Sequence, residues 1–77
     1  MDVYLAFLDD RHADLEVRPF FHVAHAMRQV FKWREIYGNS YSWIDDDVWQ
    51  KKGPWEYHCH ADVDEGPKMW IMRKEIQ

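Results

Sequence analysis

The residues best suited to chemistry are a histidine–cysteine–histidine triplet at positions 58–60. Alternate residues of a strand point to the same face, so His58 and His60 would share one face, with Asp62 as the nearest third ligand for a metal. Cys59 would point to the opposite face, into the predicted core, where a thiol lacks the exposure that a nucleophile needs. A solvated histidine pair is therefore the favoured interpretation. A metal- or small-ligand-binding site at His58, His60 and Asp62 is the alternative.

A second polar cluster lies in the acidic segment 9–14, where carboxylates and an imidazole could exchange protons. Its members are Asp9, Asp10, Arg11, His12 and Asp14. No nucleophile accompanies them, and the three glycines of the chain form no glycine-rich phosphate cradle. The segment is typical of a connecting loop, and the sequence predicts neither an enzyme nor a bound cofactor.

The third candidate is a run of three aspartates, Asp45, Asp46 and Asp47, flanked by Trp43 and Trp49. Tryptophan is enriched at interface hot spots, and neighbouring carboxylates steer a basic partner toward it. The run is therefore a candidate protein-binding patch. The alternative is that both tryptophans cover the sheet, because so small a domain needs every large side chain for its core.

Composition narrows the class of protein. A chain of 77 residues predicts a single domain, and 17% aromatic residues can give it a dense core. Its 14 acidic and 10 basic residues give a net charge of −4, which argues against direct nucleic-acid binding. The single cysteine excludes a disulfide within the chain, and no apolar run is long enough for a signal peptide or a membrane span. We expect a cytoplasmic protein.

The element that would position the histidines is a β-hairpin over residues 55–76. Apolar and polar side chains alternate along its first half, which is the period of a half-buried strand. A two-residue turn at positions 65–66 would close it, with the glycine at a positive φ. The resulting register opposes Ala61 with Trp70 and Cys59 with Met72, all on the apolar face.

Four further segments precede the hairpin. The continuous apolar run 3–8 predicts a central strand, or a strand covered on both faces. Residues 15–20 predict a short edge strand because they contain a proline. Apolar residues at three- and four-residue spacing predict a helix over 21–37, and residues 42–49 resemble a short helical turn. The predicted fold class is α+β: a small antiparallel sheet in the order β-β-α-β-β, about four strands, with one main helix packed on one face.

Three patterns give the chain a resemblance to small α+β proteins of bacteria and their phages whose function is not known. They are a Val3-Tyr4-x-Ala6 strand, an Asp10-Arg11-His12-x-Asp14 loop, and Val17-x-x-Phe20 leading into a helix. A closing Trp55-x-Tyr57 strand with an apolar partner strand is also similar, so the resemblance covers both ends of the chain and about half of its residues. It implies a small cytosolic accessory protein, linked to a phage or prophage, in which the aspartate loop is a binding surface.

The sequence thus predicts a non-catalytic protein that binds another protein, such as an inhibitor of a host defence complex. The contact would be made by the tryptophan-flanked aspartates or the polar face of the hairpin. Self-association is a further possibility, since Phe31, Ile36 or an edge strand could form a homodimer.

Overall fold

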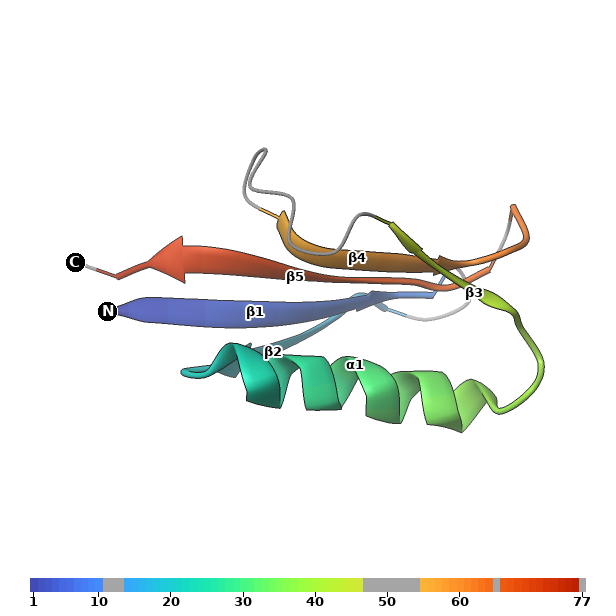
Figure 1. Ribbon diagram of the computed structural model, residues 1–77, viewed down its shortest axis with the longest axis horizontal. Coiled ribbons are helices and arrows are strands. Elements are labelled where there is room, and N and C mark those ends of the chain that lie inside the picture. The colour runs from blue at the N-terminus through green and yellow to red at the C-terminus, as the bar shows by residue number, and fades with distance from the viewer. Residues whose placement is uncertain (11–13, 47–54, 65, 77) are drawn as a thin grey trace.

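The computed structural model describes residues 1–10, 14–46, 55–64 and 66–76, which form one helix and a five-stranded antiparallel sheet. The strands follow the order β2-β1-β5-β4-β3 across the sheet. The elements are β1 (Asp2–Asp9), β2 (Glu16–Phe20), α1 (Val23–Tyr37), β3 (Trp43–Asp46), β4 (Trp55–Ala61) and β5 (Lys68–Glu75). Figure 1 shows α1 running along one side of the sheet. The predicted α+β class is confirmed, with one strand more than predicted.

The first two strands lie where the sequence predicts them. β1 lies between β2 and β5, as its continuous apolar run requires. β2 lies at the edge of the sheet, and its Pro19 pairs with Leu5. An edge position suits proline because the missing N–H would otherwise leave a gap in the hydrogen-bond ladder of an interior strand.

The helix α1 packs one stripe of side chains against the sheet. Ala26, Val30 and Trp33 are buried, and they lie three or four residues apart. His22 precedes the helix without a side-chain cap, whereas Gly38 ends it at a φ of 60° and donates its N–H to the Glu35 carbonyl. A positive φ favours glycine, so this residue fixes the point where the helix ends.

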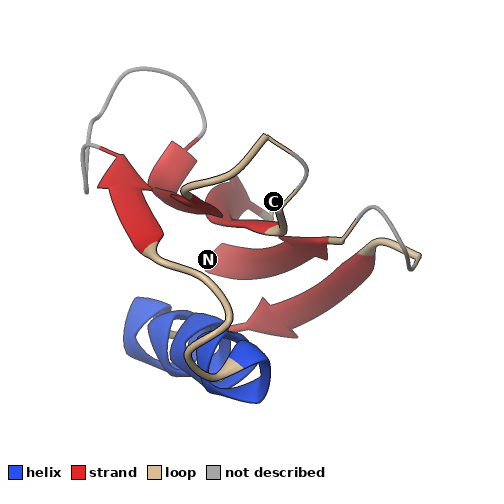
Figure 2. Ribbon diagram, turned by 90° about the vertical axis from the view of Figure 1, so that its right-hand side faces the viewer, coloured by secondary structure: helices blue, strands red, loops and turns tan. Residues whose placement is uncertain are grey.

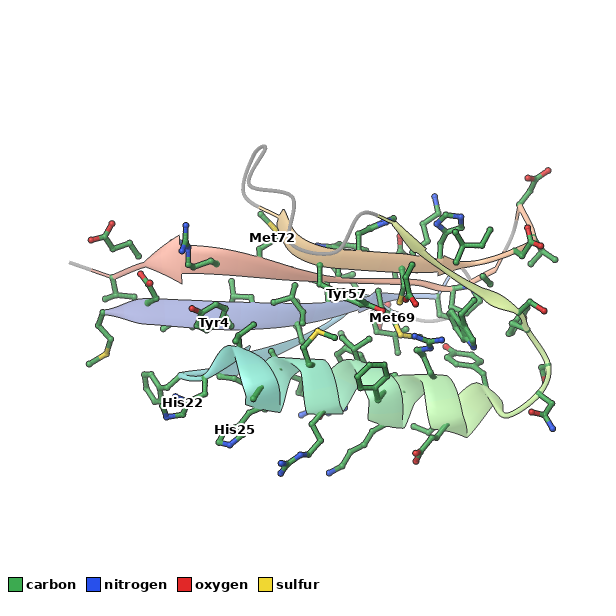
Figure 3. The ribbon with its side chains drawn as sticks, viewed as in Figure 1. Tyr4, His22, His25, Tyr57, Met69 and Met72 are labelled. Atoms are coloured by element: carbon green, nitrogen blue, oxygen red, sulfur yellow. The ribbon has the colours of Figure 1, made fainter. Side chains whose placement is uncertain are left out.

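The core lies between α1 and the facing side chains of the three middle strands. β1 contributes Ala6 and Leu8, and the hairpin contributes Tyr57, Cys59, Met69 and Ile71. In Figure 3, Tyr57 and Met69 lie on the side of the sheet that faces α1, and Met72 lies on the other. Tyr4, Phe20, Met27, Tyr37 and Trp43 pack around this core.

The hairpin exists as predicted, but its predicted register is wrong. Cys59 pairs with Met69 rather than with Met72, a difference of three residues. β4 ends at Ala61 and β5 begins at Lys68, so no two-residue turn joins them, and the Ala61 N–H donates to the Pro67 carbonyl at 3.1 Å. Of the two predicted turn residues, Glu65 lies outside the described residues and Gly66 lacks the predicted positive φ. Because three is an odd number, every side chain of β5 changes face. Met69 thus enters the core, and Trp70 leaves it.

The helical turn predicted for residues 42–49 is also wrong over the part that the structure describes. Trp43–Asp46 forms β3, an edge strand that pairs with β4. Aspartate is a poor helix former, whereas the Trp43-Ile44 pair favours a strand. Pairing with β4 also satisfies backbone groups that β4 would otherwise expose along its edge. Residues 47–49 of the prediction lie outside the described residues.

We expect Gly66→Ala to destabilise the fold by about 1–3 kcal/mol through overpacking. A Cβ atom at this position would lie 2.5 Å from the Ala61 Cβ and 2.8 Å from the Val63 Cγ2. Urea unfolding measures the effect, with Asn39→Ala in the exposed turn after α1 as the control. A Gly66→Ala variant as stable as the control would contradict this account of the connection.

Candidate functional site

The most unusual surface of the molecule is the face of the sheet that α1 does not cover. Figure 2 shows α1 against one face only. Alternation along the two central strands places apolar side chains on the other face, which we call the helix-free face. They are Val3, Leu5 and Phe7 of β1, and Trp70 and Met72 of β5; Val3 is buried and the other four are half-buried. The neighbouring strands add Val17, which is 43% exposed, and Ile44, which is 40% exposed.

Three rings, Phe7, Trp70 and His58, form a row across the helix-free face, and His60 lies next to His58 along β4. We call these four rings the aromatic ladder. Phe7 and Trp70 stack with their centroids 5.1 Å apart and their planes 10° apart. The His58 ring lies 6.5 Å from Trp70 and 5.9 Å from His60. The Phe7 and Trp70 rings thus each cover a face of the other, whereas the two histidine rings are tilted.

The predicted histidine pair shares a face, on the helix-free side. His58 and His60 line an open groove of about 390 Å³ together with Asp62, Asp64 and Lys68. However, no three His, Cys, Asp or Glu side chains in residues 1–10, 14–46, 55–64 and 66–76 are grouped so that they could hold a metal ion. Nothing in the described chain therefore completes the alternative metal site at His58, His60 and Asp62.

Two residues of the predicted aspartate patch, Asp45 and Trp43, make contacts that hold the fold together. The Tyr57 hydroxyl donates a hydrogen bond to Asp45 Oδ1, and Arg34 Nη1 contacts the same oxygen at 3.2 Å. The Arg34 guanidinium also lies 5.5 Å from the centre of the Trp43 ring. These contacts tie β3 to α1, so Asp45 and Trp43 hold the edge strand against the helix. Asp46 pairs with His58 through β3 and β4, whereas Asp47 and Trp49 lie outside the described residues.

The acidic loop is anchored at one residue. The Tyr37 hydroxyl donates to Asp10 Oδ2 at 2.7 Å, which links the end of β1 to the end of α1. Asp10 and Asp14 both line a groove of about 460 Å³ beside the helix, and Asp14 is exposed. The other two predicted members of this site, Arg11 and His12, lie outside the described residues.

Neither anchoring tyrosine is suited to proton transfer near neutral pH. Burial and then the hydrogen bond to Asp45 raise the pKa of the Tyr57 hydroxyl far above its usual 10.0. Burial and then the hydrogen bond to Asp10 raise the pKa of Tyr37 in the same way. Cys59 is fully buried in the core. The two tyrosine hydroxyls therefore stay neutral and hold the fold.

Comparison with protein-family models, with curated proteins and with solved structures found no match. The helix that the structure describes is too short and too polar to cross a membrane. The functional argument therefore rests on the geometry of the chain itself. In that geometry, the aromatic ladder brings the predicted His58 and His60 together with Trp70, which sequence reasoning placed in the core, and with Phe7, which it did not single out.

We expect the free energy of unfolding to fall as the pH rises above 10. The unfolded chain releases the protons of Tyr37 and Tyr57 near pH 10, whereas the folded chain keeps them. The unfolded state then binds fewer protons, so alkali favours it. Urea unfolding at stepwise pH measures the slope, which Tyr57→Phe should reduce. A wild-type slope that Tyr57→Phe leaves unchanged would rule out this tyrosine as a source.

Proposed function

We propose that this protein is non-catalytic and acts by binding another protein on its helix-free face. One observation carries the proposal: β1 is apolar on both faces, but α1 covers only one of them. Strands with apolar side chains on both faces are typically covered on both. Most of the central apolar residues of this face are half-buried, and exposed Val17 and Ile44 flank them. Apolar surfaces that remain accessible on small proteins commonly mark interaction sites. The helix-free face therefore has the composition of a contact surface.

The arrangement of the rings favours a protein over a single-stranded nucleic acid. Nucleic-acid platforms present open aromatic faces on which bases stack. Phe7 and Trp70 use these faces against each other, and His58 lies beyond Trp70. The net charge of −4 adds a repulsion toward phosphates. A protein surface, in contrast, can pack against ring edges and the apolar side chains around them.

The location and biological setting belong to the same proposal. The sequence resemblance supports a cytoplasmic protein linked to a phage or prophage. Inhibition of a host defence complex fits such a protein, because an acidic surface competes with nucleic acid for a basic groove. The acidic residues available for this are Asp10 and Asp14 in the groove beside α1, and Asp62 and Asp64 in the groove that His58 and His60 also line.

The test compares capture of proteins by the wild type and by Trp70→Lys from the natural host of the chain. Phe31→Lys is the matched control, because Phe31 is 47% exposed on α1 and not on the sheet. We expect Trp70→Lys to lose a protein that the wild type and the control both retain. Binding of that protein, once purified, is then measured by calorimetry with the same three baits.

Two results would contradict the proposal. One is that every captured protein binds Trp70→Lys as well as it binds the wild type. The other is that only Phe31→Lys loses the captured protein, which would move the contact surface to α1. Thermal unfolding of each bait verifies that the variants are folded, and Phe7→Ser provides a second disruption of the same stack.

A further inference from the structure

We propose that the protein on the helix-free face is a second copy of this chain, in a twofold-symmetric dimer. This inference rests on the proposed function, since it names the occupant of the same face. A twofold interface must be complementary to itself, because the same patch is used twice. The register between β1 and β5 gives the helix-free face this property.

The self-complementarity follows from four cross-strand pairs. On the helix-free face, β1 and β5 oppose Asp9 with Lys68, Phe7 with Trp70, Leu5 with Met72, and Val3 with Lys74. Consider a twofold axis that runs along the strands, between β1 and β5, in the plane of contact. It places each β1 residue of one copy over its own β5 partner residue in the other copy.

The charges match in this arrangement. Asp9 of each copy lies over Lys68 of the other, so two opposite-charge contacts form side by side at the end of the sheet where β1 ends and β5 begins. Both residues are exposed, which leaves their charged groups available to a second copy. Like charges at these two positions would disfavour a homodimer, and the opposite charges of Asp9 and Lys68 avoid this repulsion.

The apolar rows match as well. Phe7 lies over Trp70 of the other copy and Leu5 lies over Met72, a sulfur-bearing side chain that adapts to irregular neighbours. Lys74 can lay its apolar stem over the end of the apolar rows and keep its ammonium group in water. Two sheets packed face to face typically cross at about 30°, which keeps these central rows opposed. The result is an apolar centre with charged ends, the usual anatomy of an interface.

Other surfaces are less suited to a second copy. Pairing two β3 edges would bring the aspartates of both strands together, and Pro19 interrupts the edge of β2. On α1, the exposed apolar residues Phe31 and Ile36 lie on different flanks of the helix, with Lys32 and Glu35 between them in the sequence. The helix-free face is the one continuous self-complementary surface among those the structure describes.

The experiment uses two charge-reversal variants, Asp9→Lys and Lys68→Asp, in sedimentation velocity at low salt. Each variant alone turns both opposite-charge contacts into like-charge contacts, so we expect its dimer dissociation constant to rise at least about tenfold. An equimolar mixture restores opposite charges at both contacts, so it should form a heterodimer. Mixing cannot repair a defect within one chain, which separates the interface from local effects on the fold.

Two controls complete the design. The double variant Asp9→Lys/Lys68→Asp reverses both charges in one chain and should dimerise like the wild type. Trp70→Lys should be monomeric, and thermal unfolding verifies that each variant is folded. High salt should reduce the difference between the single variants and the wild type, because it screens exposed charges.

Three results would overturn the dimer. They are a wild type that sediments as a monomer at every concentration, single variants that dimerise as tightly as the wild type, and a mixture that stays monomeric. If the wild type is monomeric but still captures a different protein through Trp70, the dimer is wrong and the proposed function stands. If capture through Trp70 also fails, both are wrong.

Discussion

The register between β4 and β5 is the constraint on which the rest of the molecule depends. It pairs Cys59 with Met69 and Tyr57 with Ile71, and all four side chains enter the core beneath α1. The connection between the strands helps to fix it, since Gly66 lies so close to Ala61 that no side chain fits there. With this pairing, the alternation of side chains along β5 places Trp70 on the helix-free face.

The two faces of the sheet consequently serve different purposes. On the helix side, polar groups close the structure: Arg34 and Tyr57 hold Asp45, and Tyr37 holds Asp10. These hydrogen bonds attach the edge strand β3 and the segment after β1 to the ends of the core. Asp45 and Asp10, which the sequence offers as binding groups, thus also anchor the fold. On the helix-free face, the largest side chains of the central strands pack beside one another without a covering element in the described chain.

The sequence predicts those elements that carry their own local signal. The apolar run of β1, the proline of β2 and the stripe of α1 each specify an element and its place, and the structure agrees. The predicted register of the hairpin was wrong because residues 69–72 of β5 are all apolar. Their pattern does not show which alternate residues are buried. β3 was not predicted because its aspartates resemble the first turn of a helix. Only pairing with β4 makes a strand preferable there.

Of the aromatic ladder, only the two histidines could be predicted from the sequence. His58 and His60 share a face because alternation within one strand requires it, whatever the pairing. Phe7 and Trp70 lie beside them only because of two registers, that of β1 with β5 and that of β4 with β5. Local sequence patterns do not predict the second register. The ladder is thus a property of the sheet and of no single segment, which is why its aromatic members have no motif in the sequence.

The measurement that tests this account most directly is a set of cross-strand backbone nuclear Overhauser effects in isotopically labelled protein. The account predicts contacts that join Cys59 to Met69 and His58 to Trp70. Contacts from Cys59 to Met72 and from Ala61 to Trp70 would contradict it. They would return Trp70 and Met72 to the core and remove the aromatic ladder from the helix-free face.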